Sequence, residues 1–157
     1  MTEFTDNSLD ANAKNITITK EFDDDGSSYL VIIDDGDGIE NILNIFTGDT
    51  GKKGKKGCKN QGFLDALVFF SNVNGEIDII SNCNNKYDRI SVNFSKMKEY
   101  YNSQFNDKEL HNIDYKVCDK LLLDNFIHFK NHTIKNLDAK IMEKLKNHGT
   151  YIKIPLY

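Results

Sequence analysis

The sequence predicts an α+β fold: a two-layer sandwich in which a mixed β-sheet carries helices on one face. Short segments with strand-type alternation or a short apolar run provide the first observation, at residues 15–22, 29–34, 75–81, 88–94 and 150–156. Segments typical of helices provide the second, at residues 3–14, 39–46, 63–73 and 137–149, with further charged helical pieces across 96–135. The 157 residues contain no repeat and no linker, so we expect one domain over 1–157.

Composition excludes several classes of protein. The net charge of −4 gives no global indication of a nucleic-acid or membrane partner. The cysteines Cys58, Cys83 and Cys118 are odd in number and widely spaced, which argues against a disulfide framework. The sequence has no signal-peptide pattern and no apolar run of about 18 residues. We therefore expect a reduced intracellular protein, in the cytoplasm or nucleus, with no membrane contact.

The predicted first helix, residues 3–14, concentrates side-chain oxygens. Glu3, Asn7 and Asp10 lie three or four residues apart and so share one side of a helix, with Asp6 at its edge. Like charges at this spacing cost about 0.2–0.5 kcal/mol each. Such oxygens suit a hard cation such as Mg²⁺, and a carboxylate one turn away could activate a water molecule. A solvated acidic face is the alternative interpretation.

The segment Asp34-Asp35-Gly36-Asp37-Gly38-Ile39 follows a predicted strand. Its two glycines permit positive φ angles and a close approach of the backbone to a ligand. An aspartate at the end of a strand can accept a hydrogen bond from an exocyclic amine. A tight Asp-Gly turn between strands is the alternative.

The segment "GKKGKKGCKNQGF", residues 51–63, combines four glycines with five lysines just before a predicted helix. A glycine-rich turn that leads into a helix N-terminus can bind an anion through its free N–H groups and the helix dipole. A disordered basic loop or a weak nucleic-acid patch would have the same composition.

Together these segments resemble the motifs of the GHKL ATPases, which share the Bergerat ATP-binding fold. "E-F-T-D-N-S-L-D-A" (3–11) resembles the first motif, most closely in the form found in MutL mismatch-repair proteins, the ATP-binding subunit of topoisomerase VI and MORC proteins. "D-D-G-D-G-I" (34–39) resembles the second motif, and "G-C-K-N-Q-G" (57–62) the third, with Asn60 in place of its middle glycine. "H-G-T-Y-I-K-I" (148–154) resembles the closing Gly-Thr and its strand. The resemblance implies a Bergerat-type sandwich.

The resemblance also implies ATP and Mg²⁺ as cofactors and assigns roles by position. Glu3 would activate the attacking water, and Asn7 would hold Mg²⁺. Asp34, supported by Thr150, would accept a hydrogen bond from the adenine amino group. Gly36 and Gly38 would let the backbone pass beside the nucleotide. Lys59, Asn60 and Gly62 would belong to a lid over its phosphates.

Relatives in this family carry more chain before the first motif and a transducer domain after the Gly-Thr strand. We therefore expect an ATP-binding domain that is shortened at its N-terminus and lacks the transducer lysine. ATP hydrolysis is expected to be slow or to need a protein partner or a homodimer, in DNA repair, DNA topology or chromatin processes. Two alternatives stay open: a nucleotide-gated interaction module with weak catalysis, and a nucleic-acid binder that uses the basic loop.

Overall fold

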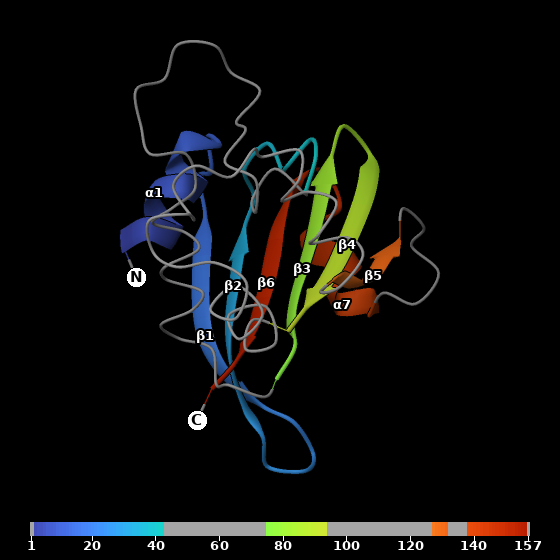
Figure 1. Ribbon diagram of the computed structural model, residues 1–157. Coiled ribbons are helices and arrows are strands. Elements are labelled where there is room, and N and C mark those ends of the chain that lie inside the picture. Colours follow the sequence, from blue (N-terminus) through green and yellow to red (C-terminus); the bar gives the residue numbers. More distant parts are fainter. Residues whose placement is uncertain (1, 43–74, 94–126, 132–137, 157) are drawn as a thin grey trace, which may run out of the picture.

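The computed structural model describes residues 2–42, 75–93, 127–131 and 138–156 (Figure 1). Within these ranges the chain forms two helices and six strands. In chain order they are α1 (Thr2–Asp10), β1 (Ile16–Phe22), β2 (Ser28–Asp34), β3 (Ile77–Cys83), β4 (Lys86–Val92), β5 (Ile127–Asn131), α7 (Ala139–Lys144) and β6 (Gly149–Pro155).

The strands form one sheet in the order β1-β2-β6-β3-β4-β5. This arrangement confirms the predicted α+β class. Every pairing between neighbouring strands is antiparallel, whereas a mixed sheet was predicted. The reason is the position of β6, which lies between β2 and β3 and runs antiparallel to both. The strands β2 and β3 therefore run in the same direction without pairing with each other.

Helix α1 is shorter than the predicted segment 3–14. It ends at Asp10 because Asn12 adopts a left-handed backbone with φ of 61°. The Ala13 N–H donates to the Ser8 carbonyl, and the Asn12 N–H donates to the Leu9 carbonyl, which is the hydrogen-bond pattern of a Schellman motif. This turn closes the helix and directs the chain into β1.

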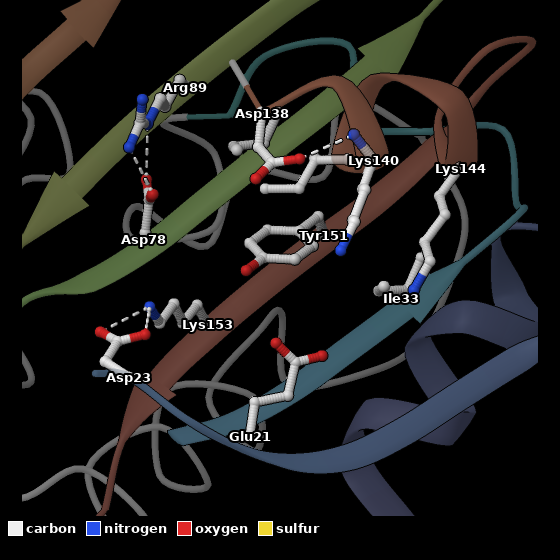
Figure 2. A pocket seen from close by; sticks show the side chains of 12 residues that line it. Glu21, Asp23, Ile33, Asp78, Arg89, Asp138, Lys140, Lys144, Tyr151 and Lys153 are labelled. Carbon is white, nitrogen blue, oxygen red and sulfur yellow. Dashed lines mark hydrogen bonds and ion pairs between the residues drawn. The ribbon is translucent and has the colours of Figure 1, made fainter. Parts of the chain in front are cut away.

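The two described helices lie on opposite faces of the sheet (Figures 1 and 2). On one face, Ser8 of α1 contacts Asp34 of β2. On the other face, Leu145 at the end of α7 packs into a cluster with Ile33 and Tyr151. The prediction of helices on one face is therefore wrong for these two helices. The physical reason is that β2 is apolar on both sides, since Val31, Ile32 and Ile33 are all buried, so both faces need a cover.

The alternation of side chains gives the α1 face a layered core. Antiparallel pairing places Ile32, Ile152, Ile79 and Ile90 in one row across four strands, and all of these are buried. Phe4 of α1 is also buried, at 1% exposure. Burial of apolar area at this density is the main source of stability for the sheet.

Some predicted elements differ from the structure or lie outside the described residues. The segment Ile127–Asn131 is strand β5, where helical pieces were predicted. Residues 39–42 are not helical, and the rest of the predicted helix 39–46 lies outside the described residues, as does the predicted helix at 63–73. Among the residues described, no helix is long and apolar enough to cross a membrane.

Candidate functional site

A row of buried polar side chains crosses the sheet at one end of the α1 face. Register pairs Asp34 with Thr150, Thr150 with Ser81, and Ser81 with Asp88, so these side chains point to the same face. All four residues are at most 6% exposed. They form the next row beyond the isoleucines. Buried polar groups in a row that could have been apolar indicate a site rather than core packing.

Asp34 lies at the end of β2 and has both carboxylate oxygens engaged. Oδ1 accepts a hydrogen bond from the Gly36 N–H at 2.9 Å. Oδ2 accepts from the Ser8 hydroxyl, also at 2.9 Å. Burial raises the pKa of Asp34 above its ordinary value, while the Gly36 N–H, the Ser8 hydroxyl and the Thr150 N–H act in the opposite direction. The result is an oriented acceptor that is largely removed from water.

Asp35, the next residue, has a different environment. Its Oδ1 accepts from the backbone N–H groups of Lys14 and Asn15, and its Oδ2 accepts from the Asn15 side chain. These hydrogen bonds, with those from Asn15 the largest cause, lower the pKa of Asp35 to about 2. Asp35 therefore fastens the segment between α1 and β1 to the end of β2, and Asp34 is left facing the site.

The glycine turn, residues 36–39, packs too closely for side chains. Gly38 has φ of 77°, and a Cβ on it would lie under 3.0 Å from the main-chain carbonyl of Asn82. A Cβ on Gly36 would lie 2.8 Å from the Ala11 carbonyl oxygen. At the end of the turn, the Ile39 N–H donates to the Ser81 hydroxyl at 2.6 Å. The turn is therefore fixed between the end of α1 and strand β3, and it leaves backbone rather than side chains at the site.

The predicted residues Glu3 and Asn7 both lie on α1, whose Ser8 contacts Asp34. Asn7 precedes Ser8, which binds Asp34, and the Asn7 side chain is half-buried. Glu3 lies one turn earlier, in the first turn of α1, and is exposed. Asn7 therefore lies beside the residue that bonds Asp34, whereas Glu3 is exposed to solvent, and the role predicted for each stays a prediction.

Three contacts of this region were not predicted from the sequence. The Ser8 hydroxyl orients Asp34, the Ser81 hydroxyl holds the glycine turn, and the His148 ring contacts the Gly36 carbonyl at 2.6 Å. The sequence did contain a signal for Ser81. In β2 and β3, two apolar residues at alternate positions are followed two positions later by a polar residue, Asp34 or Ser81. In β6 the order is reversed, with Thr150 before the two apolar residues. Ser8 also stood four residues from the buried Phe4.

The predicted lid lies outside the residues that the structure describes. Lys59, Asn60 and Gly62 fall in the range 43–74. Their predicted role in phosphate binding therefore stays a prediction.

A cavity of about 370 Å³ lies on the other face of the sheet, between α7 and the strands (Figure 2). Two ion pairs line it: Arg89 bonds Asp78 through two nitrogens at 2.9 and 2.7 Å, and Lys153 bonds Asp23 at 3.1 Å. Its charged lining is balanced, with Glu21, Asp23, Asp78 and Asp138 against Arg89, Lys140, Lys144 and Lys153. This balance favours neither anions nor cations, and the sheet separates the cavity from Asp34.

The described residues form an antiparallel α+β domain with a buried polar row, a candidate ligand site, at one end of its sheet. A family model described as Histidine kinase-, DNA gyrase B-, and HSP90-like ATPase matches residues 1–133 of the 157. The chain belongs to this family of ATP-binding domains. A comparison with curated proteins found no match.

Proposed function

We propose that the chain binds ATP at the polar end of the sheet, with adenine against Asp34 and Thr150. The observation that carries this proposal is the buried Asp34 carboxylate, oriented by Ser8 and Gly36 and paired across strands with Thr150. A carboxylate has about four lone-pair sites. Its bonds to Ser8 and Gly36 therefore leave room to accept from an exocyclic amine or from a water that bridges to one.

The glycine turn fits a purine at the same place. A Cβ on Gly36 would lie 3.1 Å from Oδ1 of Asp34, so glycine leaves bare backbone beside the acceptor. A flat ring needs such a surface, because a side chain would fill the space next to the acceptor. The chemistry of the described residues thus suits a neutral aromatic ring with a donor group.

Mg²⁺ fits Asn7 as a single protein ligand. Among the described residues, no group of three or more His, Cys, Asp or Glu side chains could hold a metal ion. Mg²⁺ bound with a nucleotide normally takes one or two protein ligands, and phosphate oxygens and water fill the remaining positions. The half-buried Asn7 amide, next to Ser8, would supply that protein ligand. The ion would neutralise phosphate charge.

We propose slow ATP hydrolysis with Glu3 as the general base. Glu3 precedes Asn7 by four residues and so lies on the same side of α1. Its exposure in the first turn means that the helix end does little to fix it, and a general base needs fixed geometry. The resemblance of the first motif supports a role in DNA repair, DNA topology or chromatin, with a protein partner, a second copy of the chain or associated nucleic acid.

The exposure of Glu3 also supports a second candidate function. In that case the chain is a nucleotide-gated interaction module, in which ATP binding rather than hydrolysis is the signal. Glu3→Ala separates the two candidates, with Asp6→Ala as the control on the same helix. Both variants are expected to bind ATP as the wild type does. Loss of phosphate release in Glu3→Ala alone supports hydrolysis, and no release from the wild type supports the module.

Thermal unfolding with ATP tests the binding site directly. At an ATP concentration about 100 times Kd, binding adds about 2.7 kcal/mol, which raises Tm by about 5–10 °C for a domain of this size. ATP, ADP and a non-hydrolysable analogue are each added with and without Mg²⁺. Asp34→Asn is expected to abolish the shift, while Asp24→Asn, an exposed residue in the turn between β1 and β2, keeps it. Equal shifts in both variants, or none in the wild type, would contradict the proposal.

A further inference from the structure

The peptide unit that joins Gly36 to Asp37 is held at both of its polar groups. The Asp37 N–H donates to the Ala11 carbonyl at 2.7 Å, and Ala11 lies just after α1. The Gly36 carbonyl contacts Nδ1 of His148 at 2.6 Å, and His148 lies just before β6. Two segments that are far apart in sequence therefore fix the orientation of one peptide plane.

This peptide plane lies next to the proposed adenine acceptor. The Gly36 N–H donates to Oδ1 of Asp34 at 2.9 Å. This N–H belongs to the preceding peptide unit, Asp35–Gly36, and the broad backbone freedom of glycine would let the two peptide planes rotate relative to each other if the Gly36 carbonyl were released. The hydrogen bond from His148 therefore bears on the direction of the Asp34 carboxylate without any contact between the two side chains.

The segment that carries His148 is anchored on each side. Before it, the buried Leu145 has a carbonyl that accepts from the Asn82 amide at 2.6 Å and from the Tyr87 hydroxyl at 3.2 Å. After it, Gly149 has φ of 139°, and a Cβ there would lie under 3.0 Å from the Asp34 carbonyl oxygen. With both neighbours fixed, the imidazole is directed toward the glycine turn. His148 itself is exposed, so it adds little to the core.

We infer that His148 is a positioning residue of the nucleotide site, which donates Nδ1–H to the Gly36 carbonyl and so orients Gly36 toward Asp34. A carbonyl oxygen can only accept, so the ring must carry its proton on Nδ1. This inference rests on the proposed ATP site. It adds a residue from the loop between α7 and β6 that does not touch the ligand but sets the geometry of the residue that does.

Calorimetric titration of Mg·ATP into the whole chain tests the inference. His148→Ala is expected to raise Kd about 5- to 10-fold, which matches the loss of one hydrogen bond. His148→Asn is expected to restore Kd to within about twofold of wild type, because the asparagine amide nitrogen, like Nδ1, is bonded to Cγ and can donate. Asn147→Ala, an exposed neighbour in the same loop, is the control and should bind as the wild type does.

The outcomes separate this inference from the proposed function. If the wild type does not bind ATP, the proposed function fails and the inference fails with it. If the wild type binds and His148→Ala binds equally well, only the inference fails. Equal weakening in His148→Ala and His148→Asn would also overturn it, because the donor would then be irrelevant.

A spectroscopic measurement provides a readout that does not depend on ATP. Two-bond ¹H–¹⁵N spectra, recorded at alkaline pH, report which ring nitrogen of His148 carries the proton. We expect the Nδ1–H form, whereas free histidine side chains favour Nε2–H. A dominant Nε2–H form would overturn the inference.

Discussion

Two glycines with similar backbones and different surroundings give the sharpest test of how the site is built. Gly26, in the turn between β1 and β2, has φ of 83° and nothing within 4 Å of the position that a Cβ would take. Gly38 has φ of 77°, but its Cβ would collide with the Asn82 carbonyl in β3. Alanine at Gly26 therefore costs only the left-handed backbone, about 1–2 kcal/mol. Alanine at Gly38 adds the collision.

The extra cost at Gly38 follows from what must move. The Asn82 carbonyl belongs to the main chain of β3, which pairs with β4 on one side and β6 on the other, so it cannot yield as a flexible side chain would. Overpacking of this kind costs about 1–3 kcal/mol. Gly38→Ala should therefore lose about 2–5 kcal/mol in total. For each kcal/mol by which Gly38→Ala is less stable than Gly26→Ala, its Tm should be about 2–4 °C lower.

Urea unfolding of the two variants and the wild type measures this difference. The m values are expected to stay equal, so that the midpoints report free energy. ATP affinity is expected to fall in Gly38→Ala and to stay unchanged in Gly26→Ala, whose turn is remote from Asp34. Equal losses of stability in the two variants would refute the packing of the glycine turn against β3, because the backbone cost alone would then explain both.

Three further predictions concern single side chains. Ser8→Ala should destabilise the fold by about 1.5–3 kcal/mol in urea unfolding, because it removes a donor from a buried carboxylate. Thr5→Ala removes a hydroxyl that bonds the Thr2 carbonyl in the first turn of α1, and it should change the stability by less than about 0.5 kcal/mol. Asp34→Asn and Asp35→Asn should give opposite pH dependences of the urea midpoint. The pKa of Asp35 is lowered from 3.8 to about 2, so the advantage of wild type over Asp35→Asn is present above pH 3.8 and is lost as pH falls toward 2. The pKa of Asp34 is raised, so wild type loses stability relative to Asp34→Asn as pH rises from 3.8 through the raised pKa. Parallel pH curves for the two variants would contradict these assignments. Leu145→Ala should cost about 2–5 kcal/mol, because this side chain is fully buried beneath α7, and a loss below about 1 kcal/mol in the same assay would contradict that packing.

The sequence predicted the strands where local pattern decides the structure. The strands β1, β2, β3, β4 and β6 follow alternation or a short apolar run. The strand β5 was missed because its residues sit among charged segments with helical character, and pairing with β4 decides its state. The opposite placement of α1 and α7 was missed because alternation shows that two faces differ but does not show which helix covers which face.

The motifs singled out Asp34, Gly36, Gly38 and Thr150 as candidate site residues. Their meeting in space depends on register: Asp34 lies opposite Thr150 only because β2 and β6 pair over six residue pairs. No local pattern encodes the contact of His148 with Gly36, which joins residues 112 positions apart. The contacts that orient the proposed ligand-binding residues could therefore be found only in the structure.

The central position of β6 has a consequence for synthesis in the cell. Before residues 149–155 leave the ribosome, the β1-β2 hairpin and the β3-β4 pair have no strand to join them. The nascent chain then exposes the unpaired edges of β2 and β3, which are templates for association with other chains. Completion of the sheet must wait for its middle strand, so we expect its two halves to depend on chaperones until β6 is available to join them.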